Sequence, residues 1–458
     1  MKERYIIDAF NMLDDAIIAE ADGVRSRVRD KEVKAGRRVR DIFGFEPAQT
    51  DIGRKCKGMA GWQKRAWYLT GICFVLLMCI KTGVSLSKPL PEISKILVQT
   101  LPDETDKELE RTLPSETADL PLLTISEDTG EGMGFEGYLA YDISELVNAN
   151  PWNEDMEIAA LPVYQNPIVY KDFCVMSGAD FGKMEEFLLE IAERLGMETD
   201  NLVITDDAPD EEEQEAIRRK AEGNLPEGYF NPRRLITETE GIRIEVDVTM
   251  SAKLEFDPAI VLPDQYHFEE QSYENMVSAA KYLQEEFKDL IGMENPQMDI
   301  YDGDYNIYGQ QSYGLAFFDK GGTDEENLIN YNFNRISFVA NEEGGLWIVR
   351  IRRPDLSKKI GDYPVINVRQ AKELLLNGKY ITSVPYEFPG ESYIAKAELA
   401  YRTGEVEQYY MPYYRFYVEI PEEKGRAGEG MKTYGAYYVP AVESTYISNM
   451  PVWDGGFD

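Results

Sequence analysis

The chain has 458 residues and a formal net charge of −35, with 83 Asp and Glu against 48 Lys and Arg. It contains one histidine and four cysteines, and only Cys174 follows residue 86. An acidic surface repels polyphosphate, so nucleic acid is excluded as a partner of the acidic residues that follow residue 86. One histidine with one cysteine also excludes a tetrahedral zinc site of the usual ligands there.

An uninterrupted apolar run extends from Ala66 to Ile80. It is shorter than the roughly 20 residues that span a bilayer, but Lys81 can extend its amine to the lipid headgroups, which prolongs the segment to Leu86. Residues 1–65 carry 15 Lys and Arg against 11 Asp and Glu, and five of these basic residues lie close to the run: Arg54, Lys55, Lys57, Lys64 and Arg65. The pattern predicts a retained transmembrane helix over 66–86 in a single-pass protein of the cell membrane. Residues 1–65 are predicted to be cytoplasmic and the C-terminal portion extracytoplasmic.

The predicted cytoplasmic segment begins with an amphipathic helix. Apolar residues recur on one face at helical spacing, namely Ile6, Phe10, Leu13 and Ile17. A helix of about 16 residues is marginal alone in water, so we expect this face to bind a partner, either a protein or the membrane surface. The basic residues 25–40 that follow are typical of a segment that contacts anionic lipid of the bilayer.

The stretch YIIDAFNMLDDAIIAEAD resembles the start of membrane-anchored proteins of Gram-positive bacteria, some of which are anti-sigma-factor-like. That resemblance implies an inner helix that binds a sigma factor, followed by a basic stretch, one membrane helix and an outer sensing domain. The chain lacks the histidine and cysteine pattern of the zinc-binding anti-sigma domains.

Residues 87–134 are rich in Pro, Thr, Ser, Asp and Glu, which predicts a flexible stalk. A first α+β domain is expected over 135–240. GYLAYDISELV and IAALPVYQNPIVY have the composition of strands, and DFGKMEEFLLEIAERLGM predicts a helix that ends at Gly196. The acidic residues 206–222 predict a solvated helix or loop.

A second α+β region is expected over 241–458. IRIEVDVTMSAKLEF alternates apolar and polar residues, which predicts one half-buried strand, and SYENMVSAAKYLQEEFKDLIG predicts one long helix capped by Ser272 and ended by Gly292. Further strands are expected at YNIYG, GLAFF, RISFVAN and LWIVRIRR, with a hairpin turn at residues 341–345. The elements together predict an α+β fold with antiparallel sheets and flanking helices.

The last part of the chain predicts one helix, NVRQAKELLLNGKY, capped by Asn367, and then the strands AKAELAYRTG, YYMPYYRFYVEI and YGAYYVPAV. Residues 411–418 and 437–442 resemble the closing strands of PepSY-like modules and of the YycI-type extracytoplasmic regulators of a wall-sensing histidine kinase. The resemblance implies a PepSY/YycI-like subdomain over 360–458 and a histidine kinase as a second candidate for the cytoplasmic partner.

Catalytic patterns are scarce. No evident nucleophile lies near His267 in the sequence, so a structural role is expected for this histidine. Asp302-Gly303-Asp304-Tyr305-Asn306 has the spacing of the first calcium ligands of an EF-hand, but Ile307 and Tyr313 occupy the glycine and glutamate positions, so the Asp-Gly pair predicts a turn. No Walker or dinucleotide motif is present. We therefore expect that the protein is not an enzyme and that it has neither a cofactor nor a metal site.

Tyrosines are abundant near the C-terminus. On alternating strand positions, half of them must face a core and the other half can form a ligand surface, for which Tyr409, Tyr413 and Tyr437 are the candidates. Such a surface would suit a glycan or a peptide. The alternative is a sheet packed on both faces.

These patterns together predict a membrane-anchored extracytoplasmic sensor or regulator, possessing an anti-sigma-like inner helix, that relays an envelope signal to a cytoplasmic partner. Two alternatives stay open. The first is an anchored envelope binding protein without signalling, and the second is a carboxylate-dependent cell-wall hydrolase.

Overall fold

The computed structural model describes residues 120–126, 136–172, 174–221, 224–306, 308–423 and 430–456. All of them belong to the larger of two compact units of the chain, residues 106–458. The inner segment with Ile6, Phe10, Leu13 and Ile17, the predicted membrane helix over 66–86 and most of the predicted stalk lie outside the described residues. Among the helices that are described, none is long and apolar enough to cross a membrane.

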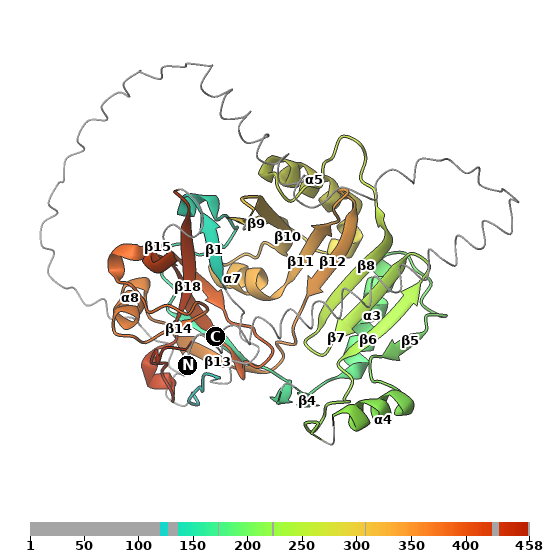
Figure 1. Cartoon of the computed structure of the whole chain (residues 1–458), viewed down its shortest axis with the longest axis horizontal. Helices are drawn as coiled ribbons and strands as arrows, with labels where there is room; N and C mark the ends of the chain where they lie inside the picture. Colours follow the sequence, from blue (N-terminus) through green and yellow to red (C-terminus); the bar gives the residue numbers. More distant parts are fainter. Residues whose placement is uncertain are drawn as a thin grey trace, which may run out of the picture. The chain divides into compact units, whose positions relative to one another are not determined.

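The described chain is α+β and mainly antiparallel, as the sequence predicts, and its largest element is an eight-stranded sheet (Figure 1). In spatial order its strands are β5 (Ile204–Asp206), β6 (Arg234–Thr239), β7 (Ile242–Asp247), β8 (Ser251–Ile260), β12 (Leu346–Arg352), β11 (Arg335–Ala340), β10 (Gln311–Asp319) and β9 (Pro296–Tyr305). Every pair in this sheet is antiparallel.

Helices α3 (Phe181–Arg194), α5 (Tyr273–Glu286) and α6 (Lys288–Ile291) contribute to the largest apolar core, which covers one face of this sheet. The side chain of Ser272 caps α5, as predicted, and that of Asp180 caps α3. The prediction of a single long helix over 272–292 is wrong in one respect. It is broken at Phe287, whose φ of −103° and ψ of 24° are not helical. Helix α4 (Glu211–Lys220), in the acidic stretch, buries no residue.

Two strand predictions in this sheet are wrong. IRIEVDVTMSAKLEF is a hairpin of β7 and β8 rather than one strand, because the Asp247 carboxylate accepts hydrogen bonds from the backbone of Thr249 and Ser251 and holds a turn there. YNIYG is not a separate strand: Tyr305 ends β9, and Asn306 begins the connection to β10, where its side chain accepts from the backbone of Tyr308 and Gln310.

Helix α7 (Asp324–Phe333) has no counterpart in the sequence prediction. It is capped by Thr323 and packs on the other face of the eight-stranded sheet, where the rings of Tyr331 and Phe318 lie 5.3 Å apart at 88°. The same helix contacts β15, so it lies between the eight-stranded sheet and the second large sheet.

The second large sheet contains β1 (Gly137–Ala140), β18 (Lys432–Pro440), β17 (Pro412–Glu419) and β15 (Ile394–Tyr401) in that order, and β14 (Ile381–Thr382) also pairs with β18. The predicted order of one helix, α8 (Val368–Leu376), followed by antiparallel strands is confirmed. A three-stranded sheet of β13 (Lys359–Pro364), β2 (Ala160–Gln165) and β16 (Tyr409–Tyr410) and a β3–β4 hairpin (Val169–Lys171, Cys174–Ser177) complete the fold.

The predicted division between 240 and 241 does not follow this fold. It falls in the tight turn of the β6–β7 hairpin, whose strands pair from Thr239 and Ile242 onwards. The first strand, β1, pairs with the last strand, β18, so both ends of the described chain build one sheet (Figure 1). Part of the predicted stalk is also folded. Leu123 is completely buried, bridges to Ile447 and contributes to an apolar core.

Candidate functional site

Charged and tyrosine side chains gather where the two large sheets meet. The eight-stranded sheet and α7 contribute Asp299, Tyr301, Asp302, Tyr331 and Arg335, and the second sheet with its preceding residue contributes Glu136, Tyr138, Lys396, Glu398, Arg415 and Tyr417. We call these residues the polar seam. They come from strands that are distant in sequence, and only the tertiary fold brings them together.

On the side of the eight-stranded sheet, the seam contains a buried ion pair. The Arg335 Nη2 atom lies 2.5 Å from Asp299 Oδ2, and the Asp299 side chain has no exposed area. The guanidinium also lies over the rings of Tyr301 and Tyr331, at 5.1 Å and 4.9 Å from their centroids. Burial raises the pKa of Asp299, and Arg335 opposes this shift.

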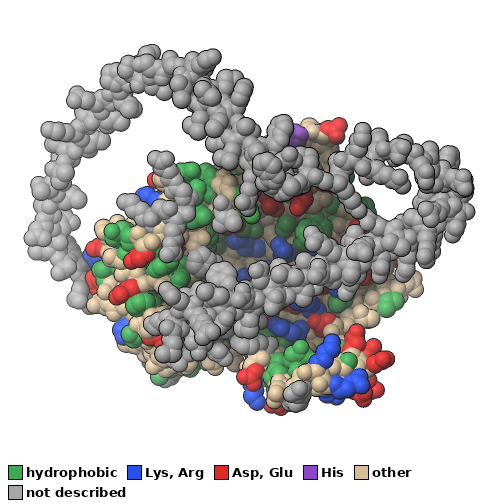
Figure 2. Space-filling view, in the orientation of Figure 1, with side chains coloured by type: hydrophobic (Ala, Val, Ile, Leu, Met, Phe, Trp, Pro, Cys, Tyr) green, Lys and Arg blue, Asp and Glu red, His purple; other side chains and the backbone are tan. Residues whose placement is uncertain are grey.

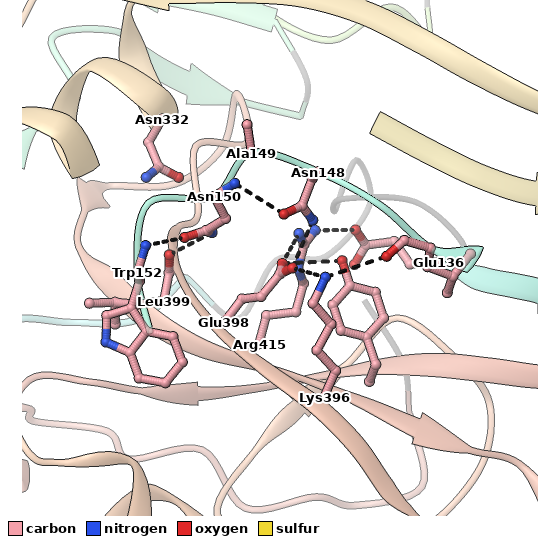
Figure 3. A network of polar contacts seen from close by, with 12 residues as sticks. Glu136, Asn148, Ala149, Asn150, Trp152, Asn332, Lys396, Glu398, Leu399 and Arg415 are labelled. Atoms are coloured by element: carbon pink, nitrogen blue, oxygen red, sulfur yellow. Dashed lines mark hydrogen bonds and ion pairs between the residues drawn. The ribbon is translucent and has the colours of Figure 1, made fainter. Parts of the chain in front are cut away.

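On the side of the second sheet, Glu398 is the centre of a hydrogen-bonded network (Figure 3). Its carboxylate accepts from Arg415 at 2.6 Å, from Lys396 at 2.7 Å, and from the side-chain amide of Asn148 at 2.7 Å. Burial alone would raise the pKa of Glu398, but the two cations and their hydrogen bonds lower it to about 2. The carboxylate therefore stays ionised and is occupied by its partners.

A short segment after β1 joins the two sides of the seam. Its Asn148 donates to Glu398 (Figure 3), and its next backbone N–H, that of Ala149, donates to Asp299 Oδ1 at 2.6 Å. Val147 N–H donates to the Asp302 carbonyl oxygen at 2.9 Å, and Asn150 Nδ2 to that of Leu399 at 3.1 Å. Residues 147–150 thus hydrogen-bond to β9 in one sheet and to β15 in the other.

The seam encloses a small pocket of about 120 Å³, lined by residues of both sheets and by Leu146, Val147 and Asn148. Its polar lining includes two guanidinium groups, those of Arg335 and Arg415, and the carboxylate of Asp302. The Arg415 Nε atom is buried and has no hydrogen-bond partner among the described groups. The pocket therefore offers donors and an acceptor of opposite charge to a small polar ligand.

Asp302 stands out within the pocket lining. The protein atoms around it and the neighbouring Asp304 carboxylate raise its pKa to about 6, although its side chain keeps exposed area. Its φ of 69° and the φ of 101° at Gly303 form a bulge in β9, opposite Gln311 and Tyr313 in β10. The predicted Asp-Gly turn is therefore wrong, because these residues lie inside a strand. A strained backbone and a shifted pKa together are typical of functional sites.

His267, the single histidine of the chain, lies at the surface (Figure 2). It lines a hollow of about 500 Å³ together with Asp264, Glu269 and Glu343, and this lining contains no serine, threonine or cysteine. The hydroxyl or thiol nucleophile that a histidine base would activate is therefore absent from that lining. In the part of the chain that the structure describes, no group of His, Cys, Asp and Glu side chains is arranged to hold a metal ion.

The predicted tyrosine ligand surface is not formed by two of its three residues. Tyr413 and Tyr437 are completely buried, and only Tyr409 is partly exposed. The reason is that the second large sheet is packed on both faces. Tyr437 belongs to one apolar core and Tyr413 to another. The alternative of a sheet buried on both sides is the correct one.

The sequence analysis did not predict the buried charged residues of the polar seam. A signal was present, since Asp299 interrupts the apolar strand MDIY, Glu398 lies in AKAELAY and Arg415 stands within the aromatic strand YYRFYV. A charge in a strand that is otherwise apolar indicates either an edge or a buried pair. Only the pairing of the strands decides between these two.

No family model and no curated protein matches this chain.

Proposed function

We propose that the chain is a membrane-anchored extracytoplasmic sensor, in which the polar seam is the element that responds to an envelope signal. One observation carries the proposal. The two large sheets meet at a pocket, each sheet contributes one buried ion pair beside it, and residues 147–150 hydrogen-bond to a carboxylate of each pair. A polar contact of this kind can be rearranged by a bound molecule more easily than a close-packed apolar core.

The remaining parts of the proposal rest on the sequence. Residues 66–86 anchor the chain in the cell membrane, residues 1–65 lie in the cytoplasm, and the helix face of Ile6, Phe10, Leu13 and Ile17 binds a sigma factor or a histidine kinase. In this arrangement a change at the seam outside reaches the partner inside through the single membrane helix. A glycan or a peptide of the envelope is the expected class of signal.

A transcript measurement tests the sensor in its own host. Deletion of the protein and the substitution Phe10→Asp should change the same set of transcripts, because a charge in the apolar face abolishes partner binding. Asn148→Ala should shift the level of these transcripts, because Asn148 touches Glu398 across the seam. The matched control is Asn153→Ala, whose side chain caps only a local turn.

Unchanged transcripts in the deletion strain would reject signalling and favour the anchored envelope binding protein. Changed transcripts in the deletion strain together with a silent Phe10→Asp variant would reject the inner helix as the interface. A change in transcripts for Asn153→Ala equal to that for Asn148→Ala would remove the seam from the proposal.

One observation favours the second function, the carboxylate-dependent hydrolase. Asp302 has a pKa of about 6 and lines a pocket, as a general acid does. Incubation of the full-length chain with cell-wall fragments tests this function. Turnover that Asp302→Asn lowers by several orders of magnitude would establish the hydrolase, and absence of turnover supports the sensor.

A further inference from the structure

A second pocket, of about 440 Å³, lies at another part of the boundary between the eight-stranded sheet and the rest of the fold. Its lining includes Asp247, Thr249 and Ser251 from the β7–β8 hairpin, Arg352 from β12, and Glu405 and Tyr410 from the loop after β15 and from β16. Its volume is in the range of small-molecule sites, whereas the pocket of the polar seam is smaller.

Arg352 is a half-buried cation in this lining without a carboxylate partner among the described residues. Its Nη2 atom donates to the Thr403 carbonyl oxygen at 3.3 Å, a long hydrogen bond. On the adjacent strand, Arg335 stands directly opposite, which places two like charges on neighbouring positions. Burial lowers the pKa of the Arg352 guanidinium and Arg335 adds to this shift, whereas Tyr410 and Asp247 partly oppose it. An anionic group would therefore be stabilised beside Arg352.

Asp247 contributes the opposite charge to the same lining without pairing with Arg352. Its Oδ1 atom accepts from Thr249 N at 2.8 Å, Thr249 Oγ1 at 2.6 Å and Ser251 N at 3.1 Å. These bonds fix the carboxylate in the hairpin turn, and its Oδ2 atom accepts no hydrogen bond from the described groups. The Arg352 guanidinium and the Asp247 Oδ2 atom are therefore both able to form further hydrogen bonds with a ligand.

Tyr410 and Glu405 also line this pocket. Tyr410 is buried, and its hydroxyl forms no hydrogen bond with the described groups, so it can donate to an anion beside Arg352. Glu405 is bound by Arg233 Nη2 at 2.5 Å. Arg352 and Tyr410 are therefore suited to a carboxylate, and Asp247 to an ammonium group.

We propose that this pocket binds a small zwitterion of the amino-acid type, with its carboxylate on Arg352 and Tyr410 and its ammonium group on Asp247. The binding step is independent of the proposed signalling role. Because the lining joins the eight-stranded sheet to strand β16, a bound zwitterion would also connect separate parts of the fold.

Calorimetric titration of the full-length chain tests the proposal. The probes are L-alanine, L-glutamate, L-lysine and L-tyrosine, followed by the N-acetyl and the amide derivative of the one that binds best. Loss of either charge should weaken binding about 10- to 100-fold, because each removes a charge-assisted contact. Saturable binding by none of the four amino acids, or equal binding of the zwitterion and its amide, would overturn the proposal.

The variants assign the two contacts separately. Arg352→Gln should weaken the amino acid and its N-acetyl derivative, whereas Asp247→Asn should weaken the amino acid and its amide and leave the N-acetyl derivative unaffected. Asn at 247 keeps the Oδ1 acceptor of the turn. Tyr410→Phe should weaken the carboxylate-bearing probes by a smaller factor.

Arg350→Gln is the matched control, because Arg350 stands two residues from Arg352 on the same strand, is exposed and does not line the pocket. If Arg350→Gln and Arg352→Gln weaken amino-acid binding equally, the loss of affinity comes from the change in overall charge, and the proposed site is rejected. Thermal unfolding verifies each fold. If Arg352→Gln fails to fold, Arg352→Lys, which keeps the charge and loses the planar fork, serves in its place. Failure of the transcript experiment with a positive titration would reject the signalling role alone.

Discussion

Arg335 and Arg352 are direct partners across the β11–β12 pair, but only Arg335 has a carboxylate beside it among the described residues. Arg335 lies 2.5 Å from the buried Asp299 and lines the pocket of the polar seam. Arg352 lines the pocket of about 440 Å³, and among the described groups its side chain bonds to the Thr403 carbonyl oxygen alone. The Arg335 guanidinium is thus neutralised by a buried carboxylate, whereas the Arg352 guanidinium faces the pocket for which we propose zwitterion binding.

Glu398→Gln should destabilise the protein by about 3–5 kcal/mol at neutral pH, because it leaves Arg415 and Lys396 without their buried counter-charge. The pKa of Glu398 is lowered, so its stabilisation is present above pH 4.5 and is lost as the pH falls towards about 2. Chemical denaturation at several pH values measures both effects. The matched control is Glu419→Gln at the half-exposed pair with Lys432, which should cost less than about 1 kcal/mol. Equal costs for the two variants would contradict this assignment.

Asp302→Asn should alter the pH dependence of stability in the opposite direction. The pKa of Asp302 is raised from 3.8 to about 6, so the folded state holds a proton that the unfolded state releases, and wild-type stability falls as the pH rises through this window. The asparagine variant lacks this contribution and should gain melting temperature relative to wild type between pH 4 and pH 7. The exposed Asp264→Asn serves as the control for loss of one charge. A constant difference between Asp302→Asn and wild type across this range would refute the expected shift.

Gly303→Ala should destabilise the protein by roughly 2–4 kcal/mol. Its φ of 101° is unfavourable for alanine, and a Cβ atom there would lie 2.2 Å from the Glu145 carbonyl oxygen. Gly309→Ala is the control, since its φ is also positive at 73° but no atom lies within 4 Å of the added carbon, so only about 1 kcal/mol is expected. Denaturant unfolding compares the two. A Gly303→Ala variant as stable as Gly309→Ala would show that the bulge can relax.

Protease added to intact protoplasts should remove the C-terminal portion and leave residues 1–65 protected. The expectation follows from the basic residues before Ala66 and from the apolar run that follows them. Antibodies against an N-terminal and a C-terminal tag on the full-length chain report the two ends. Protection of the C-terminal tag in intact protoplasts, with cleavage after lysis, would reverse the topology and remove the basis of the sensor.

The sequence by itself determined the local elements whose causes are local. The predicted caps Ser272 and Asn367 begin α5 and α8, and the predicted Gly196 follows α3 with a φ of 73°. Apolar periodicity likewise predicted strands of the antiparallel sheets and hence the fold class. These features depend on hydrogen bonds and contacts within a few residues, which a linear pattern records.

Only the tertiary structure decided the pairing of distant strands and everything that depends on it. Strand β1 pairs with β18, nearly 300 residues later in the chain, and apolar packing on both faces of the sheet that they share buries Tyr413 and Tyr437, which looked available for a ligand. The same fold brings Asp299, Glu398 and Asn148 into one network, and Asp247 and Arg352 into one pocket. A charge in an apolar strand has the same local pattern whether it faces solvent or a buried partner, and its partner is set by long-range packing that no short stretch of sequence contains.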